Sequence, residues 1–315
     1  MTTSSTRSTI TEHAPTTDPS ISAIAAGRLM VVAAMAMQAI GKVAFGTWLF
    51  DLPSTSFVFL SFGLTAALFL LIFPIGRGEP ALGLLALLNV FTAVTFLCFF
   101  FALKHVEPAI VGALEIGIGP IAALLLTAVH TGHRPDGRRI GIGLGVMVGC
   151  AALAHAALDG SGLLVSRGQY PMLGLIASVT AGVGATLITI LSKSLANRGW
   201  SSGAILAHRF YLIVPLALGL AVFQTDGVIV PSTMTSFDDG IMIVLVALIG
   251  VTLPLYLLQL GIKRCEPYTV MVCLAALPVM TFLLQGLSPA YAWSWPTLIG
   301  ISIIALAVII DSRQG

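Results

Sequence analysis

The chain has 315 residues, of which 57% are hydrophobic and 9% are charged, and its mean hydropathy is +1.01. Soluble domains carry roughly 25% charged residues, so this composition excludes an ordinary soluble protein. The net charge of +2 indicates no nucleic-acid partner. We therefore expect an integral membrane protein, with the lipid bilayer as its surroundings.

The chain starts with a polar segment. Eleven of the first 20 residues are Ser or Thr, and no apolar run interrupts them. This composition predicts that residues 1–24 form a disordered cytoplasmic tail and not a cleavable signal peptide. The cysteines lack metal-ligand spacing, so they predict neither a disulfide framework nor a zinc site, and we interpret them as packing residues: Cys98, Cys150, Cys265 and Cys273.

Uncharged runs follow one another from residue 29 onward. Residues 267–310 hold no Asp, Glu, Lys or Arg over 44 positions, which predicts two crossings joined near Ser288, since one crossing takes roughly 20 residues. Charged and Gly/Pro-rich breaks divide the chain into ten predicted transmembrane helices, at residues 27–49, 56–75, 81–103, 108–128, 139–158, 171–192, 202–224, 239–262, 267–287 and 294–311. Segments of this length without period-2 alternation exclude a barrel and predict an all-α bundle.

The basic residues predict the orientation, because Lys and Arg concentrate in cytoplasmic loops. With the N-terminus inside, 11 basic residues are cytoplasmic and only two, Lys104 and Arg167, lie outside. Lys42 and Arg209 fall within helices. The sequence thus predicts a multi-pass protein of the cell membrane with both termini in the cytoplasm.

The chain also repeats itself. The segment KHVEP at 104–108 recurs as KRCEP at 263–267, a spacing of 159 residues. Five predicted helices separate the two copies. Because five is odd, the copies enter the membrane from opposite sides, which predicts two inverted five-helix repeats, 27–158 and 171–311, with a site near the midplane between them. Each Glu-Pro pair fits a helix start.

These features resemble a known family. The five-plus-five layout, the Lys-x-x-Glu-Pro segments and the mid-helix residues Pro120 and Pro278 look like the drug/metabolite transporter superfamily, in particular its EamA-type members. Ala113-Leu114-Glu115, followed by Gly119-Pro120, is also similar to a pattern in bacterial threonine/homoserine exporters. The resemblance implies a transporter with a central cavity between its two halves, not an enzyme, and helices that break at Gly119, Pro120 and Pro278.

Two charged residues fall inside predicted helices at matched depth. Lys42 and Glu115 each lie about seven residues from the outer helix end, roughly 10 Å below the interface. Gln38 precedes Lys42 by one turn. Buried charges in a membrane need a partner or a cavity. Two interpretations stay open: a static Lys42–Glu115 ion pair, or a site for substrate or protons.

Further polar side chains are candidates for the cavity wall. Tyr256 and Gln259 share a helix face with Thr252, and Thr186 lies on another helix. Hydroxyls in membrane helices also bond to their own backbone, so the structural interpretation is as good. The run Gly141-x-Gly143-x-Gly145 lacks the strand and the Lys-Ser/Thr of a phosphate loop, and it is typical of close helix packing.

The sequence therefore predicts a secondary-active transporter that exports a small polar, amino-acid-like metabolite by alternating access. No cofactor or metal is expected, although proton coupling is an option. The oligomeric state could be a monomer or a homodimer. The alternatives are a transporter of drug-like or other organic solutes in either direction and, outside this class, a membrane enzyme or receptor.

Overall fold

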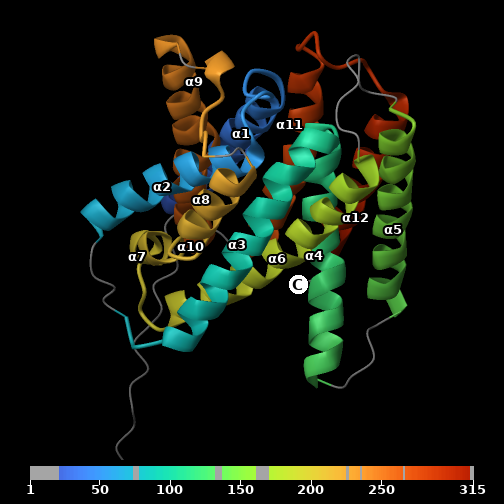
Figure 1. Cartoon of the computed structure of the whole chain (residues 1–315). Coiled ribbons are helices and arrows are strands. Elements are labelled where there is room, and N and C mark those ends of the chain that lie inside the picture. Colours follow the sequence, from blue (N-terminus) through green and yellow to red (C-terminus); the bar gives the residue numbers. More distant parts are fainter. Residues whose placement is uncertain are drawn as a thin grey trace, which may run out of the picture.

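Helices make up every regular element in the described part of the chain (Figure 1). The structure is a computed structural model, and it describes residues 21–73, 78–131, 137–160, 170–224, 227–234, 236–264 and 267–312. Most of the predicted polar tail, Cys265, Glu266 and several basic loop residues lie outside these ranges. The described chain thus agrees with the all-α class.

The first half of the chain forms five uninterrupted helices: α1 (Ile21–Thr47), α2 (Ser54–Ile72), α3 (Leu82–His105), α4 (Pro108–Thr131) and α5 (Gly137–Leu158). Each one overlaps a segment predicted from the apolar runs. α4 begins at Pro108, as the Glu-Pro pair predicts, because proline fits the first helical position, where no backbone donor is needed. Ala109 N–H at this end donates to Gln285 Oε1 (3.2 Å), and Gln285 Nε2 donates to Glu107 Oε2 (2.9 Å).

The second half is less regular. Its elements are α6 (Pro171–Asn197), α7 (Ser202–His208), α8 (Ile213–Gln224), the 3-10 turn η1 (Ser232–Met234), α9 (Phe237–Ala247), the π-helical turn η2 (Leu248–Thr252), α10 (Leu253–Arg264), α11 (Pro267–Gln285) and α12 (Trp295–Ser312). Two predicted continuous helices therefore differ from the prediction. Segment 202–224 is broken at 209–212, and segment 239–262 contains a π turn.

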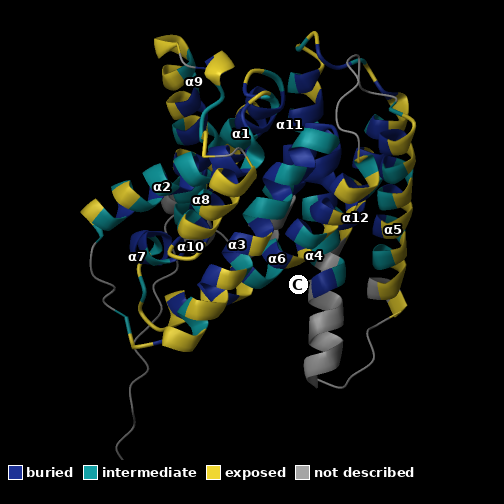
Figure 2. Cartoon of the chain, viewed as in Figure 1, coloured by how far each residue is buried: buried dark blue, intermediate teal, exposed yellow. Residues whose placement is uncertain are grey.

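Seven of the helical stretches in the described ranges are long and apolar enough to cross a membrane, namely Ala25–Thr47, Ser54–Ile72, Leu82–His105, Ile140–Leu158, Pro171–Asn197, Ser202–Gln224 and Phe237–Gly261. Three further apolar stretches are shorter: Pro108–Gly119, Cys273–Gln285 and Trp295–Ile310. Large apolar side chains cover the outward faces of α5, α8 and α9, where Figure 2 shows exposed positions. Such faces suit a hydrocarbon solvent, so this is a multi-pass membrane protein.

The helices pack in pairs drawn from both halves. α3 packs along α6, α5 along α12, and α1 against both α10 and α11. α4 contacts α6, α11 and α12 and so takes a central place (Figure 1). Glycines permit the closest approaches: a Cβ on Gly182 of α6 would lie 2.8 Å from the carbonyl oxygen of Glu115.

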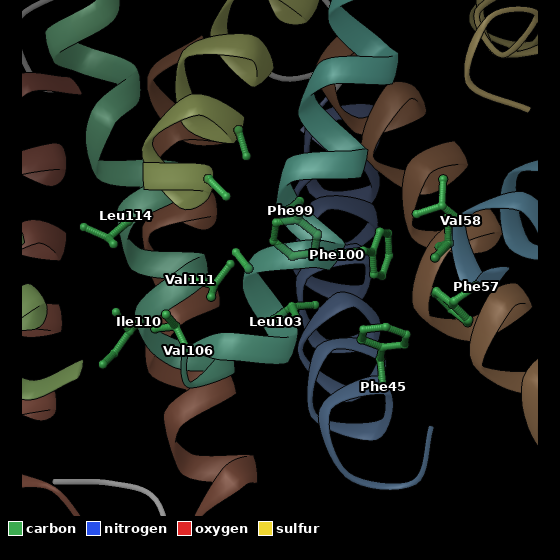
Figure 3. Packing of buried hydrophobic residues seen from close by; sticks show 14 of the residues in the cluster. Phe45, Phe57, Val58, Phe99, Phe100, Leu103, Val106, Ile110, Val111 and Leu114 are labelled. Atoms are coloured by element: carbon green, nitrogen blue, oxygen red, sulfur yellow. The ribbon is translucent and has the colours of Figure 1, made fainter. Parts of the chain in front are cut away.

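A cluster of aromatic rings joins α1, α2 and α3. The ring centroids of Phe45 and Phe57 are 4.6 Å apart, and those of Phe57 and Phe100 are 5.0 Å apart. Figure 3 shows these three rings on one side of α3, while Val111 of α4 lies on its other side. Offset and edge-to-face contacts of this kind add to the burial of apolar area and fix how the helices are spaced.

The predicted helix breaks at Gly119, Pro120 and Pro278 are wrong. α4 runs through the first two residues and α11 through the third. A proline removes one backbone donor, and in a bundle the neighbouring helices hold such a helix in place. Gly119 faces α6 at an ordinary contact distance, since a Cβ there would lie 3.5 Å from the hydroxyl of Thr186.

Candidate functional site

An ion pair joins the two charged residues that the sequence places at matched depth. Lys42 Nζ of α1 donates to Glu115 Oε2 of α4 at 3.0 Å. The lysine side chain is 6% exposed and the glutamate side chain 19% exposed, so the lysine is the more deeply buried partner. The pair satisfies the requirement that buried charges in a membrane find a partner.

The surroundings of Lys42 fit its ammonium group closely. Nζ lies 4.7 Å from the ring centroid of Phe99 on α3, within the range of a cation–π contact. It also lies over Gly112 of α4, where an added Cβ would be 3.2 Å away. Gly112 is one turn before Glu115. A larger residue there would displace the ammonium group that Glu115 holds.

The pair lies in the wall of a pocket inside the bundle. The pocket is lined by residues of α1 to α4 and of the segment from α9 to α10: Gln38, Gly41, Lys42, Phe57, Phe96, Phe99, Phe100, Glu115, Val246, Gly250, Val251 and Leu255. It offers about 40 Å³ to the centres of water molecules. A single water needs roughly 10–15 Å³ by this measure, so in this conformation the pocket has room for a few waters and for no larger molecule.

The far wall of the pocket has irregular backbone. Gly250 belongs to the π turn η2, and a Cβ on Gly41 of α1 would lie 2.3 Å from its Cα. The two backbones therefore touch. Thr252, which ends the turn, shares a 2.7 Å hydrogen bond with Thr65 of α2. Turns of π geometry inside longer helices occur frequently at functional sites.

A second irregular segment lies between α7 and α8. Asn89 of α3 bridges it: Nδ2 donates to the carbonyl oxygen of His208 (2.9 Å), and Oδ1 accepts from Leu212 N–H (3.2 Å). Arg209 directly follows α7 and is 2% exposed. Its guanidinium carbon lies 5.8 Å from the ring centroid of Phe96, which lines the pocket.

The remaining predicted site residues fall in two groups. Gln38 lines the pocket with Lys42 and Glu115. Thr186, Tyr256 and Gln259 are not among the lining residues. The Thr186 hydroxyl donates to Gly182 O of its own helix (3.0 Å), and the Tyr256 ring packs on Phe69 of α2 at 5.4 Å between centroids.

Sequence reasoning missed the aromatic part of the wall. Four phenylalanines line the pocket: Phe57, Phe96, Phe99 and Phe100. In the sequence they are part of apolar runs that also cover lipid-facing positions, so no pattern separates them. Gly250 has an indirect signal, Pro254 four residues later, because a proline cannot donate to the carbonyl oxygen of residue i−4 and so favours irregular backbone there.

Comparisons with known proteins give a family match for part of the chain and a fold match for nearly all of it. Residues 25–154 match the EamA-like transporter family, and this region includes Lys42 and Glu115. A comparison with curated proteins gave no match. Fifteen chains of solved structures match. One of them, titled only as the crystal structure of a protein, is 18% identical with a TM-score of 0.58, covering 93% of this chain and 98% of its own.

The fold and the site together define a multi-pass helical membrane protein with a charged pocket in its interior. The part of the chain that supplies both charges is similar to EamA-like transporters. The structural likeness extends over both halves, and at 18% identity it bears on the fold alone.

Proposed function

We propose that the chain is an EamA-type secondary-active transporter that exports a small polar, amino-acid-like metabolite across the cytoplasmic membrane. The Lys42–Glu115 ion pair, exposed to an internal pocket, is the observation that carries the proposal. The match of residues 25–154 to a transporter family supports the class. The driving force in this proposal is a proton gradient or the substrate gradient itself.

The chemistry of the pair suits reversible binding. Glu115 is the partly exposed partner, so a ligand in the pocket reaches its carboxylate before it reaches Lys42. The ammonium group of an amino acid, or a proton, would replace the lysine as its partner. The second repeat has no equivalent acid, since Leu274 of α11 aligns with Glu115.

Reciprocal helix pairs support alternating access by two inverted repeats. If α1 corresponds to α6, α3 to the α9–α10 segment and α4 to α11, then α3·α6 corresponds to α1·α10, and α4·α6 to α1·α11. All four pairs pack together, and α4·α11, α5·α12 and α2·α8 join counterparts. A glycine allows close contact in two corresponding places: Gly41 of α1 contacts Gly250 of η2, and Gly184 of α6 contacts Thr95 of α3. Rocking of one repeat against the other would open the pocket to each side in turn.

The pocket is closed toward one end of the bundle. Phe45, Phe57 and Phe100 lie between the ion pair and the helix ends Thr47 and Ser54. Lys104 adds to this closure, because its ammonium group donates to Leu49 O (2.7 Å) and Phe50 O (2.6 Å). In the proposed orientation this is the outer end, so substrate would leave after these rings separate.

The orientation with both termini in the cytoplasm is part of the proposal. Reporter fusions test it directly. A fusion after Arg138 should report the inside and one after Asp226 the outside, and the reverse result at either position would exclude this orientation.

Flux in reconstituted vesicles tests the function. Vesicles loaded with radiolabelled L-threonine should lose it faster than protein-free vesicles, and Glu115→Gln should abolish the difference while Glu115→Asp retains part of it. Ser302→Ala is a matched control, because Ser302 is exposed and its hydroxyl bonds only to Leu298 O of its own helix. Threonine efflux that survives Glu115→Gln with an unchanged pH profile would refute the role of Glu115.

The aromatic lining favours a second candidate, a transporter of drug-like organic cations. Four phenylalanines face the pocket, and aromatic faces attract cations that have apolar bodies. The same vesicles would distinguish the two, because ethidium in place of threonine should then be the transported solute.

A further inference from the structure

Arg209 is a buried cation without a counter-ion in the described part of the chain. Arg209 is 2% exposed, and its Nε atom has no hydrogen-bond partner among the residues that the structure describes. The ion pairs among the described residues are Lys42–Glu115 and His155–Asp159, and neither includes this guanidinium. Guanidinium groups stay charged under all ordinary conditions, so Arg209 cannot avoid the cost of a buried charge by losing a proton.

Its protein surroundings compensate the charge only in part. The guanidinium carbon lies 5.4 Å from the ring centroid of Phe210 and 5.8 Å from that of Phe96. Phe62 of α2 contacts both rings, at 5.2 Å and 4.5 Å between centroids. Aromatic faces attract a cation, but they accept none of the five N–H groups in the way that a carboxylate does. A side chain that is 2% exposed is not extended to an aqueous interface either.

The location of Arg209 connects it to the pocket. Phe96 separates the two, because its ring faces the guanidinium and also lines the pocket with Glu115. Lys42 and Glu115 neutralise each other. The positive charge of Arg209 therefore gives the interior of the bundle around the pocket a net positive charge. Arg209 also follows the end of α7, where residues 209–212 are not helical, and broken helices in transporters form substrate sites.

We propose that Arg209 binds the carboxylate of the transported metabolite when the Phe96 side chain moves aside. This assignment rests on the proposed transport function, and it restricts the substrate class: the solute must carry an anionic group. A planar guanidinium and a carboxylate form two parallel hydrogen bonds, which a lysine in the same place would not reproduce. A ligand carboxylate would supply the counter-ion that the described residues do not.

Three probes that differ by one group test the proposal. L-Threonine carries a carboxylate and an ammonium group, L-threoninol has an alcohol in place of the carboxylate, and 3-hydroxybutyrate lacks the ammonium group. Thermal unfolding of the detergent-purified protein measures binding, because a ligand of the folded state raises the unfolding midpoint. Threonine and 3-hydroxybutyrate should raise the midpoint of the wild-type protein, and threoninol should not.

Substitutions assign the effect to Arg209. Arg209→Gln should remove the carboxylate-dependent shift and raise the KM for threonine at least tenfold, while Arg209→Lys should retain part of both. Arg198→Gln is the matched control, since it removes an exposed arginine at the end of α6 and should leave both readouts unchanged. If Arg209→Gln does not fold, Arg209→Lys and the three wild-type probes still decide the question.

The outcomes separate this inference from the proposed function. Midpoint shifts that follow the carboxylate and disappear in the Arg209 variants, without any threonine flux, would support the anion site and count against transport of threonine. Threonine flux that is equal in wild type and Arg209→Gln would support transport and overturn the anion site. Equal shifts by threonine and threoninol in the wild-type protein would also overturn it, and Arg209 would then be held by its aromatic neighbours alone.

Discussion

The two sides of the pocket are built differently. The first-half side consists of α1 to α4, which are regular helices, and its charges are paired, Lys42 with Glu115. The second-half side has a π turn at Leu248–Thr252, and the neighbouring break at 209–212 places Arg209 behind Phe96. Thus the paired charges lie on regular backbone, and Arg209, which has no counter-ion among the described residues, lies on irregular backbone.

Because their backbones differ, we expect the two sides of the pocket to differ in how far they change shape. Regular helices joined by an ion pair form a wall whose backbone keeps its geometry, while the aromatic side chains on it can still separate. Non-helical backbone absorbs changes in φ and ψ within a few residues, so the second-half side is where we expect the shape of the pocket to change. Variants that weaken one side only can therefore test the comparison.

The largest effect is expected on the rigid side, at Lys42. Lys42→Met leaves Glu115 without its partner, and loss of one member of a buried pair costs about 3–5 kcal/mol when the other stays charged. Lys42→Met combined with Glu115→Gln removes both charges, so it should recover most of that loss. Thermal unfolding of the detergent-purified variants measures the difference.

The combined variant is also the control for the ion pair. If its unfolding midpoint falls by the sum of the two single shifts, the charges do not interact, and the rigid wall is held by packing alone. A midpoint well above that sum indicates coupling between the two side chains.

The sequence predicted much of the first-half side and little of the second. Uncharged runs locate the helices because a bilayer excludes charge whatever the tertiary packing, and two ionisable residues at matched depth must find partners. The break after Arg209 has only one local signal, Pro215, which suits the first turn of α8 better than the middle of a continuous helix. Both ends of the break are hydrogen-bonded to Asn89, which is 119 positions from His208 in the chain. Long-range hydrogen bonds of this kind cannot be inferred from one sequence.

A smaller effect is expected where the two sides touch, at Gly41. In Gly41→Ala the new Cβ would lie 2.3 Å from Gly250 Cα, a backbone atom that cannot rotate away. We expect a loss of about 1–3 kcal/mol in stability, typical of overpacking, and slower transport, because α1 and the π turn must separate. Gly83→Ala in α3 is the matched control, since apart from its own stretch of helix no described atom lies within 4 Å of its Cβ position. Equal unfolding midpoints for the two variants would show that the contact between α1 and the π turn is not a constraint.

The smallest effect is expected on the irregular side, at Asn89. Asn89→Leu keeps a side chain of similar size but removes the amide that joins α3 to both ends of the break, through His208 and Leu212. Hydrogen bonds between membrane helices contribute about 0.6 kcal/mol each on average, so a loss of about 1–2 kcal/mol is expected. The loss should be local, because the helices on either side of the break keep their packing. Hydrogen exchange should therefore speed up at Phe210 to Leu212 and stay unchanged in α4, whereas Ser178→Ala, which removes a hydroxyl bonded only to Gly174 of its own helix, should leave the break protected. Faster exchange throughout α3 and α4 would mean that the break is part of the rigid wall, and the division of the pocket into a fixed and a deformable side would be wrong.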